Sequence, residues 1–196
     1  KDGNQWMGTR HHGVLINGKP HIGYPEYERA FVQERINDIM RDSKDRIWIG
    51  AVNSGIYLST PDGKGGFSFQ RMLNRPEIRN EVNILRQLKD GTICAGFGRG
   101  FILFNPDELI ADTTKYTYYS AENSAMASEE IRDILEDEDG NLWVATVGAG
   151  LFKAWGDKKD LQFKQYTTKN GLPSDLTCSL EMDQNGNLWI GTEYGI

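Results

Sequence analysis

Oxygen-bearing side chains alternate in the segment EDEDGN, residues 136–141, in a pattern that could bind a cation. Asp137, Asp139 and Asn141 stand two residues apart, like the oxygen ligands of a calcium loop. A helix-loop-helix calcium site needs about twelve residues and a closing bidentate glutamate, whereas the apolar pair Leu142 and Trp143 follows here at once. The segment is therefore predicted to be a structural hairpin turn, with calcium binding as the less favoured alternative.

The histidines and the remaining acidic residues form no recognisable catalytic or metal-binding pattern. His11 and His12 are neighbours, and neighbouring strand residues point to opposite faces, so the two would share a metal ion only if the backbone bent between them. Together with His21 they are predicted to be exposed loop residues. The 28 acidic residues include no pair that stands out as acid and base, and no nucleophile elbow or Ser-His-Asp order occurs. No catalytic residue, metal or cofactor is predicted.

The turn phrase around Trp143 belongs to an internal repeat. Aligning the aromatic position gives five copies, at intervals of 42, 46, 49 and 46 residues. Blades of a β-propeller, each a four-stranded sheet, have about this length. The anchors are Trp6, Trp48, Cys94, Trp143 and Trp189.

Each copy has the chemistry of a tight hairpin followed by a buried strand. Glycines such as Gly140 and Gly186 tolerate the positive φ that a hairpin turn requires. Apolar residues on both alternating faces of 142–145 predict a strand that is covered on both sides. The residue two positions after the anchor is small in every copy, as at Gly191, which leaves room for the ring or for a side chain of the adjacent sheet.

These patterns predict an all-β fold, a β-propeller of four-stranded antiparallel blades, present as an incomplete segment of about four blades. In the best-defined unit the strands are expected at 131–136, 141–146, 150–154 and 161–166, and the chain is treated as a single domain, 1–196. The predicted parts are a partial blade 1–34, blades at about 35–74, 81–120 and 130–167, and a partial blade 175–196. Copies of the segment are expected to associate, either through their open blade faces or within a dimer of the parent sensor.

Composition excludes several partners. The formal net charge is −6 and the basic residues form no stripe, which argues against nucleic acid. No run of 18 apolar residues is present, so no membrane contact is expected for this segment. Lys1 leads directly into turn residues, and the natural start of the protein is expected to lie upstream.

The two cysteines are predicted to be structural. Cys94 and Cys178 form no CxxC pair and lie in apolar strand patterns. Both are therefore expected to be buried free thiols that behave as small hydrophobic residues.

Variable loops on this constant scaffold are the predicted recognition site. The connection between the second and third strand differs in each copy: RHH at 10–12, VNS at 52–54, FGR at 97–99, VGA at 147–149 and EY at 193–194. Aromatic faces and bidentate polar groups suit a sugar, and loops on a rigid frame commonly hold binding residues. The candidate ligand-binding residues are Arg10, His12, Asn53, Phe97, Arg99 and Tyr194.

The C-terminal repeat resembles a known family. The string GLPSD at 171–175, followed by NGNLWIGT at 185–192, is similar to the two-component-regulator propeller repeat of hybrid sensor kinases from gut Bacteroidetes. The copy at Cys94 departs most from that pattern. The resemblance implies a periplasmic sensor region of an inner-membrane-anchored protein, which responds to oligosaccharides and switches on polysaccharide-utilisation genes. No histidine-kinase motif lies in this chain.

Two other functions stay open at this point. A propeller lyase or glycosidase would share the turn signature and would need a cluster of acid, base or metal ligands at one mouth of the propeller. A protein-interaction scaffold would bind a partner and no small molecule.

Overall fold

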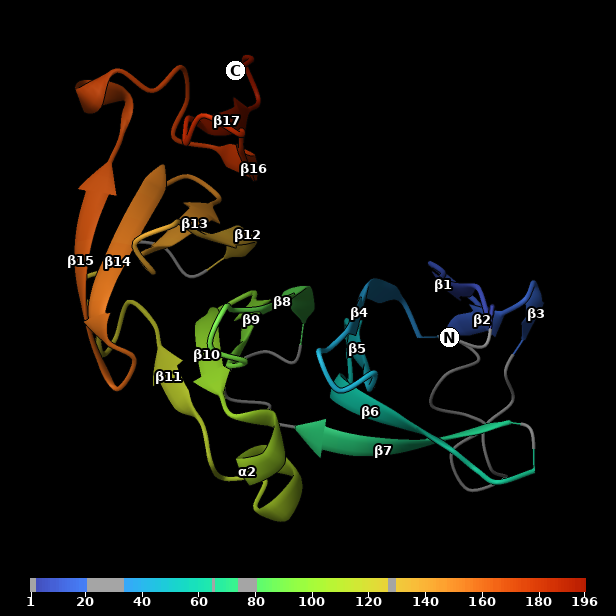
Figure 1. Cartoon of the computed structure of the whole chain (residues 1–196). Coiled ribbons are helices and arrows are strands. Elements are labelled where there is room, and N and C mark those ends of the chain that lie inside the picture. Colours follow the sequence, from blue (N-terminus) through green and yellow to red (C-terminus); the bar gives the residue numbers. More distant parts are fainter. Residues whose placement is uncertain (1–2, 21–33, 65, 74–80, 127–129) are drawn as a thin grey trace. The chain divides into compact units, whose positions relative to one another are not determined.

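The computed structural model describes residues 3–20, 34–64, 66–73, 81–126 and 130–196 (Figure 1). The chain divides into two compact units, Lys1–Leu85 and Arg86–Ile196. His21 lies outside the described residues.

The first unit holds two antiparallel sheets. Strands β1 (Trp6–Gly8), β2 (Val14–Ile16) and β3 (Lys19–Pro20) form one, and β4 (Ile36–Arg41), β5 (Ile47–Ala51), β6 (Gly55–Pro61) and β7 (Phe67–Leu73) form the other. Each strand pairs with its neighbour in the sequence, as in a propeller blade. Buried side chains from both sheets, among them Val14, Ile49 and Tyr57, make one core cluster.

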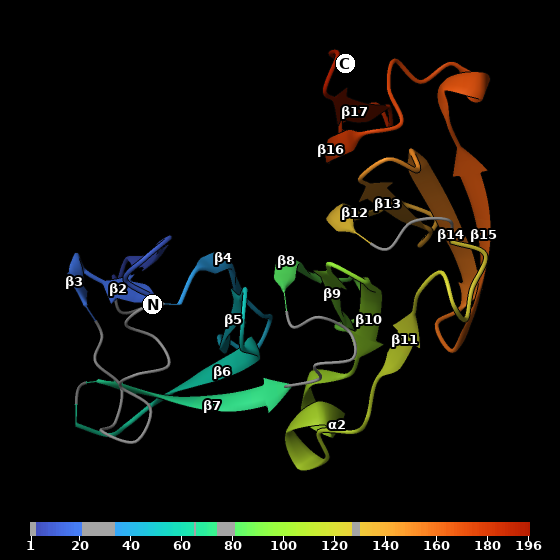
Figure 2. The same cartoon turned by 180° about the vertical axis from the view of Figure 1, so that it is seen from behind.

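The remaining sheets follow the same meander. One contains β8 (Val82–Gln87), β9 (Ile93–Phe97), β10 (Gly100–Phe104) and β11 (Thr117–Tyr119), and the next contains β12 (Ile131–Glu136), β13 (Leu142–Thr146), β14 (Leu151–Asp157) and β15 (Asp160–Tyr166). Strands β16 (Thr177–Met182) and β17 (Leu188–Thr192) make a two-stranded sheet. Figure 2 shows the same strands from behind. The predicted all-β fold of four-stranded antiparallel blades is confirmed.

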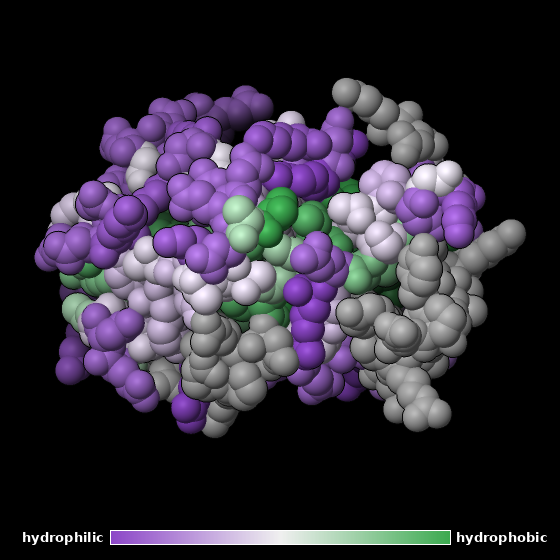
Figure 3. All heavy atoms as spheres, turned by 90° about the horizontal axis from the view of Figure 1, so that it is seen from below, coloured by the Kyte–Doolittle hydropathy of each residue, from purple (hydrophilic) through white to green (hydrophobic). Residues whose placement is uncertain are grey.

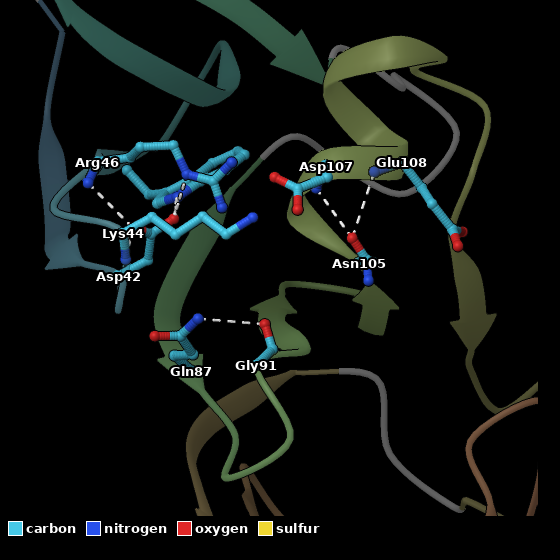
Figure 4. Close-up of polar contacts among 9 residues, drawn as sticks. Asp42, Lys44, Arg46, Gln87, Gly91, Asn105, Asp107 and Glu108 are labelled. Atoms are coloured by element: carbon cyan, nitrogen blue, oxygen red, sulfur yellow. Dashed lines mark hydrogen bonds and ion pairs between the residues drawn. The ribbon is translucent and has the colours of Figure 1, made fainter.

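Within the described residues, helical structure is confined to short connections. The helix α2 (Pro106–Ala111) joins β10 to β11, and the side chain of Asn105 caps it by accepting from the N–H groups of Asp107 and Glu108 (Figure 4). The 3₁₀ turn η2 (Thr168–Asn170) follows β15. Hydrophilic side chains cover most of the face seen in Figure 3, with a smaller hydrophobic area among them.

Small residues let neighbouring sheets approach each other. A Cβ at Gly50 would press on the Val82 side chain of β8, and one at Gly8 would press on Ile36 of β4. Strand β9 is buried at every position, and β13 at every position except the half-buried Trp143. The prediction that the strand after the turn is covered on both faces is therefore confirmed.

The two cysteines differ from the prediction. Cys94 is buried in β9, but Cys178 is exposed, so its predicted burial was wrong. The pairing of β16 with β17 shifts register between Thr177 and Ser179, which leaves Cys178 as the extra residue of a β-bulge. A bulge breaks the alternation on which the burial of Cys178 was predicted, and the side chain turns outward.

Candidate functional site: the loops and turns of the repeats

The acidic turn segment around Asp137 is saturated by the protein's own donors. One carboxylate oxygen, Oδ1, accepts from the backbone N–H of Asp139 at 3.1 Å and of Asn141 at 2.8 Å. The other, Oδ2, accepts from the Asn141 amide at 2.8 Å and from the indole N–H of Trp143 at 3.0 Å. Because these bonds occupy both oxygens, the geometry favours the structural turn over a calcium loop.

The same arrangement recurs in two other repeats. Asp42 accepts from the backbone of Lys44 and Arg46 (Figure 4), and its Oδ2 accepts from the indole N–H of Trp48 at 2.9 Å. Asp183 accepts from Asn185, Asn187 and the indole of Trp189. An aspartate six residues before the tryptophan thus ties the hairpin to the strand that follows it.

These contacts also set the acidity of the three aspartates. Burial by itself raises the pKa of Asp42, but hydrogen bonds from Trp48 and Arg46 outweigh it and hold the pKa below its usual value. Burial also raises the pKa of Asp137, but hydrogen bonds from Asn141 and Trp143 outweigh this effect and lower the pKa. At Asp183, hydrogen bonds from the Asn187 side chain and backbone lower the pKa to about 2.

The third repeat replaces both ends of this contact together. Leu88 stands where the aspartate would be, and Cys94 stands where the tryptophan would be. Both are buried, so an apolar pair takes the place of the carboxylate–indole bond without leaving a polar group unpaired. Burial raises the pKa of the Cys94 thiol far above its usual value, which keeps it a neutral, unreactive side chain.

In the first unit, the structure brings two of the candidate loops together. The carbonyl of Glu34 accepts from the N–H of Gly13, at the end of the 10–12 loop, and its carboxylate accepts from the N–H of Asn53 at 2.6 Å. Glu34 is buried, whereas Arg10, His12 and Asn53 are exposed. One buried residue, Glu34, therefore holds both loops, one through its backbone carbonyl and one through its carboxylate, while the loop side chains face the solvent.

A threonine closes three of the loops from within. Thr9 donates to the carbonyl of Gly13 and accepts from the N–H of His12 at 2.8 Å. Thr146 and Thr192 make the matching bonds to the carbonyls of Gly150 and Gly195. This threonine was not among the predicted functional residues, although its position three residues after the anchor is visible in the repeat.

The structure corrects the prediction for Phe97. It is the last residue of β9, wholly buried, and occupies the position of the loop-closing threonines. Because its side chain is wholly buried, the ring belongs to the core and has no free face for a ligand.

The other two candidates of the second unit belong to different sheets. Arg99 is half-buried in the turn between β9 and β10, and its carbonyl accepts from the hydroxyl of Tyr118. Tyr194 is 77% exposed beyond β17. The sheet β12–β15 lies between them, since β12 contacts both β9 and β16. Arg99 and Tyr194 thus form no single cluster with each other.

Metal sites and membrane-spanning helices are lacking in the described part of the chain. No group of three or more His, Cys, Asp or Glu side chains there could hold a metal ion. No helix within the described ranges is long and apolar enough to span a bilayer.

Sequence comparison identifies the repeat. Residues 125–148 and 171–194 match the family model described as "Two component regulator propeller". The resemblance noted for the C-terminal repeat is thereby confirmed, and extends to the repeat before it. No curated protein sequence matches the chain.

Solved structures share the fold. The chain is similar to the extracellular domains of two putative hybrid two component systems from B. thetaiotaomicron, with TM-scores of 0.70 and 0.56 at 19% and 18% identity. These matches cover 99% of this chain but only 25% and 37% of the other chains. The WD40 beta propeller domain of Doa1 matches at a TM-score of 0.63 and 10% identity, over 98% of this chain and 58% of that one. At such identities the likeness establishes the propeller fold alone.

Proposed function

We propose that this chain, which carries two-component regulator propeller repeats, is a non-catalytic ligand-sensing segment in the periplasmic part of a hybrid two-component sensor. The observation that carries the proposal is the match of residues 125–148 and 171–194 to the repeat model. The likeness to extracellular domains of hybrid two component systems supports it. Since the chain spans only 25% and 37% of those two structures, activity of the whole protein is part of the proposal.

An oligosaccharide is the proposed ligand, bound at the variable loops. Exposed Arg10, His12 and Asn53 offer charged, imidazole and amide groups, and Tyr194 offers an exposed ring. Sugars pair hydroxyls with such polar groups and stack their apolar faces on aromatic rings. Through the parent sensor, binding would be signalled to polysaccharide-utilisation genes. Association of copies through sheet faces stays a prediction.

The structure gives the binding loops a stable frame. Glu34 fixes the loops of His12 and Asn53 through backbone N–H groups, which leaves the side chains at both loop tips available to a ligand. Preorganised loops lose less conformational entropy when they bind. This arrangement suits recognition, and it supplies no paired acid and base for turnover.

Binding titrations with loop variants test the proposal. The chain is titrated with neutral and acidic oligosaccharides of two to six sugar units, and each mixture is analysed for cleavage products after incubation. We expect saturable binding without products, and a loss of roughly tenfold in affinity for the alanine variant of whichever loop binds the saccharide, with His12→Ala, Arg99→Ala and Tyr194→Ala each tested separately. The control Lys64→Ala, in the turn between β6 and β7 at the other end of the strands, should bind as the unmodified chain does.

Two outcomes would overturn it. Shortened or unsaturated products would identify a glycosidase or a lyase. Absence of binding to every saccharide, together with unchanged induction of the target genes when the loop variants are placed in the parent sensor, would leave the interaction-scaffold function in its place.

A further inference from the structure

A cavity of about 660 Å³ lies within the first unit, away from the loops just described. Its walls come from both sheets of the unit: residues 3, 4 and 6 beside β1, and side chains of β4, β5, β6 and β7. It lies at the turn end of the strands, because Arg41, Asp45 and Ile47 flank the turn between β4 and β5. Its volume falls in the range of small-molecule sites.

One residue of the cavity wall, Ser59, has a buried hydroxyl without a hydrogen-bond partner among the described residues. Ser59 of β6 is only 4% exposed, and its Oγ has no hydrogen-bond partner in the described part of the chain. A buried hydroxyl without a partner is destabilising. Structures keep such a group where a ligand or a water completes it.

Aromatic side chains form one wall. The rings of Trp6 and Phe67 meet edge to face, with centroids 4.6 Å apart, and both line the cavity. Trp48, Trp143 and Trp189 each donate their indole N–H to an aspartate. The indole N–H of Trp6 makes no hydrogen bond to the residues that the structure describes. Trp6 therefore offers both a ring face and a donor.

Charged groups of opposite sign stand at the rim. The Arg41 guanidinium lies 3.7 Å from the Asp45 carboxylate. The Arg41 side chain is 58% exposed and the Asp45 side chain is 50% exposed. Together they offer donors and acceptors while their charges cancel, which suits vicinal hydroxyls of an uncharged molecule.

From these features we infer a second ligand site, for a neutral sugar ring, in the cavity lined by Trp6, Ser59 and Phe67. A sugar ring has an apolar face for the indole and hydroxyls for Ser59 and the rim. An apolar peptide side chain would fill the aromatic part equally well but would leave the Ser59 hydroxyl unpaired in a dry site, so the sugar is favoured. The inference stands on the cavity and does not depend on ligand binding at the variable loops.

Fluorine NMR of the chain labelled with 5-fluorotryptophan tests the site directly. The chain has five tryptophans, and a Trp6→Phe variant assigns the Trp6 signal. The probes are neutral di- to tetrasaccharides in one series and tripeptides with a central leucine or phenylalanine in the other. We expect the Trp6 signal to move saturably with a saccharide and to stay in place with the peptides.

A conservative pair of variants separates ligand binding from folding. Ser59→Ala removes only the unpaired hydroxyl and should weaken saccharide binding at Trp6 by roughly tenfold without lowering stability. Ser68→Ala, on the neighbouring strand β7 and outside the cavity, is the control and should leave the affinity unchanged.

Three results would overturn the inference: a Trp6 signal that no saccharide moves, one that only the peptides move, and one that shifts equally in Ser59→Ala. The first would leave the cavity with ordered water only. The variants His12→Ala and Arg99→Ala should not alter the saccharide-induced shift of the Trp6 signal. They therefore distinguish binding in the cavity from binding at the variable loops.

Discussion

At the scale of single residues, the aspartate six positions before Trp48, Trp143 and Trp189 is the main local support of the repeat. Asp137 accepts hydrogen bonds from two backbone N–H groups, an amide and an indole. Its neighbour Asp139 lies exposed in the same turn and contributes a backbone N–H to that network. The two aspartates lie in the same turn, but only the Asp137 carboxylate holds the hairpin together, whereas Asp139 contributes its backbone N–H.

We predict that Asp137→Asn destabilises the chain and Asp139→Asn does not. The asparagine amide places a donor where the Trp143 indole or the Asn141 amide needs an acceptor, which should lower the free energy of unfolding by about 1 to 3 kcal/mol. Urea unfolding followed by tryptophan fluorescence measures it. Equal stability of the two variants would show that the carboxylate does not support the hairpin.

The lowered pKa values of Asp42, Asp137 and Asp183 predict a pH dependence with a definite sign. A carboxylate whose pKa is lower in the folded chain stabilises it above the unfolded pKa of 3.8, and loses that effect as the pH falls through the folded pKa. The free energy of unfolding should therefore decline from about pH 4 down to about pH 2.

Unfolding by urea at a series of acidic pH values checks this slope. Asp137→Asn should reduce the slope, and Asp139→Asn should keep it. A decline that is as steep in Asp137→Asn would assign the acid sensitivity to other groups.

At the scale of elements, the loop between β13 and β14 needs glycine at two positions for different physical reasons. Gly148 has φ of +83° with open space around it. Gly150 has φ of +74°, and a Cβ there would collide with the backbone carbonyl of Tyr166. Backbone strain acts at both positions, but the collision acts only at Gly150.

Alanine at the two positions should separate strain from collision. Gly148→Ala is expected to cost about 1 to 2 kcal/mol from the left-handed backbone alone. Gly150→Ala is expected to cost about 3 kcal/mol or more, because the carbonyl of β15 must move. Thermal and urea unfolding measure both. A similar cost for the two variants would mean that the close approach to Tyr166 is not a constraint.

Much of the element structure could be predicted from the sequence. Strands expected at 131–136 and 161–166 are observed at Ile131–Glu136 and Asp160–Tyr166. Alternating hydrophobicity and glycine turns suffice for this because both are local. The bulge that exposes Cys178 could not be foreseen, since it depends on the pairing of two strands.

The candidate site was harder to predict for the same reason. Phe97 was assigned to a loop by its letters, but the strand continues through it. Glu34 bonds to Asn53, which is distant in the sequence, and Ser59 lines a cavity whose walls come from two sheets. Periodicity does not report such contacts, whereas the threonine at 9, 146 and 192 could have been found in the alignment of the repeats.

At the scale of the molecule, aspartates join one sheet to the next. Asp38 of β4 accepts from the N–H of Leu85 in β8 at 2.8 Å, and Asp133 of β12 accepts from the N–H of Leu180 in β16 at 2.9 Å. In repeat proteins such nearest-neighbour interfaces carry much of the stability. These two bonds should therefore couple the opening of adjacent sheets.

We predict that Asp133→Asn uncouples β16 from β12. Its amide cannot accept from Leu180 and Ile134 together, so hydrogen exchange at the Leu180 amide should become roughly tenfold faster. Arg86→Gln removes the ion pair to Asp133, at 3.1 Å, but keeps the Asp133 carboxylate, so it should leave that exchange rate nearly unchanged. An unaltered Leu180 rate in Asp133→Asn would contradict the coupling.

We propose that the variable loops bind a saccharide without converting it. Hydrogen–deuterium exchange of the chain, with and without a saturating oligosaccharide that is recovered intact, is the decisive experiment. We expect slower exchange in one or more of the loops at residues 10–12, 52–54, 98–99 and 193–194, with the hairpin turns at 42–46 and 137–141 unaffected. Protection confined to those hairpin turns, or an oligosaccharide recovered as cleaved products, would contradict it.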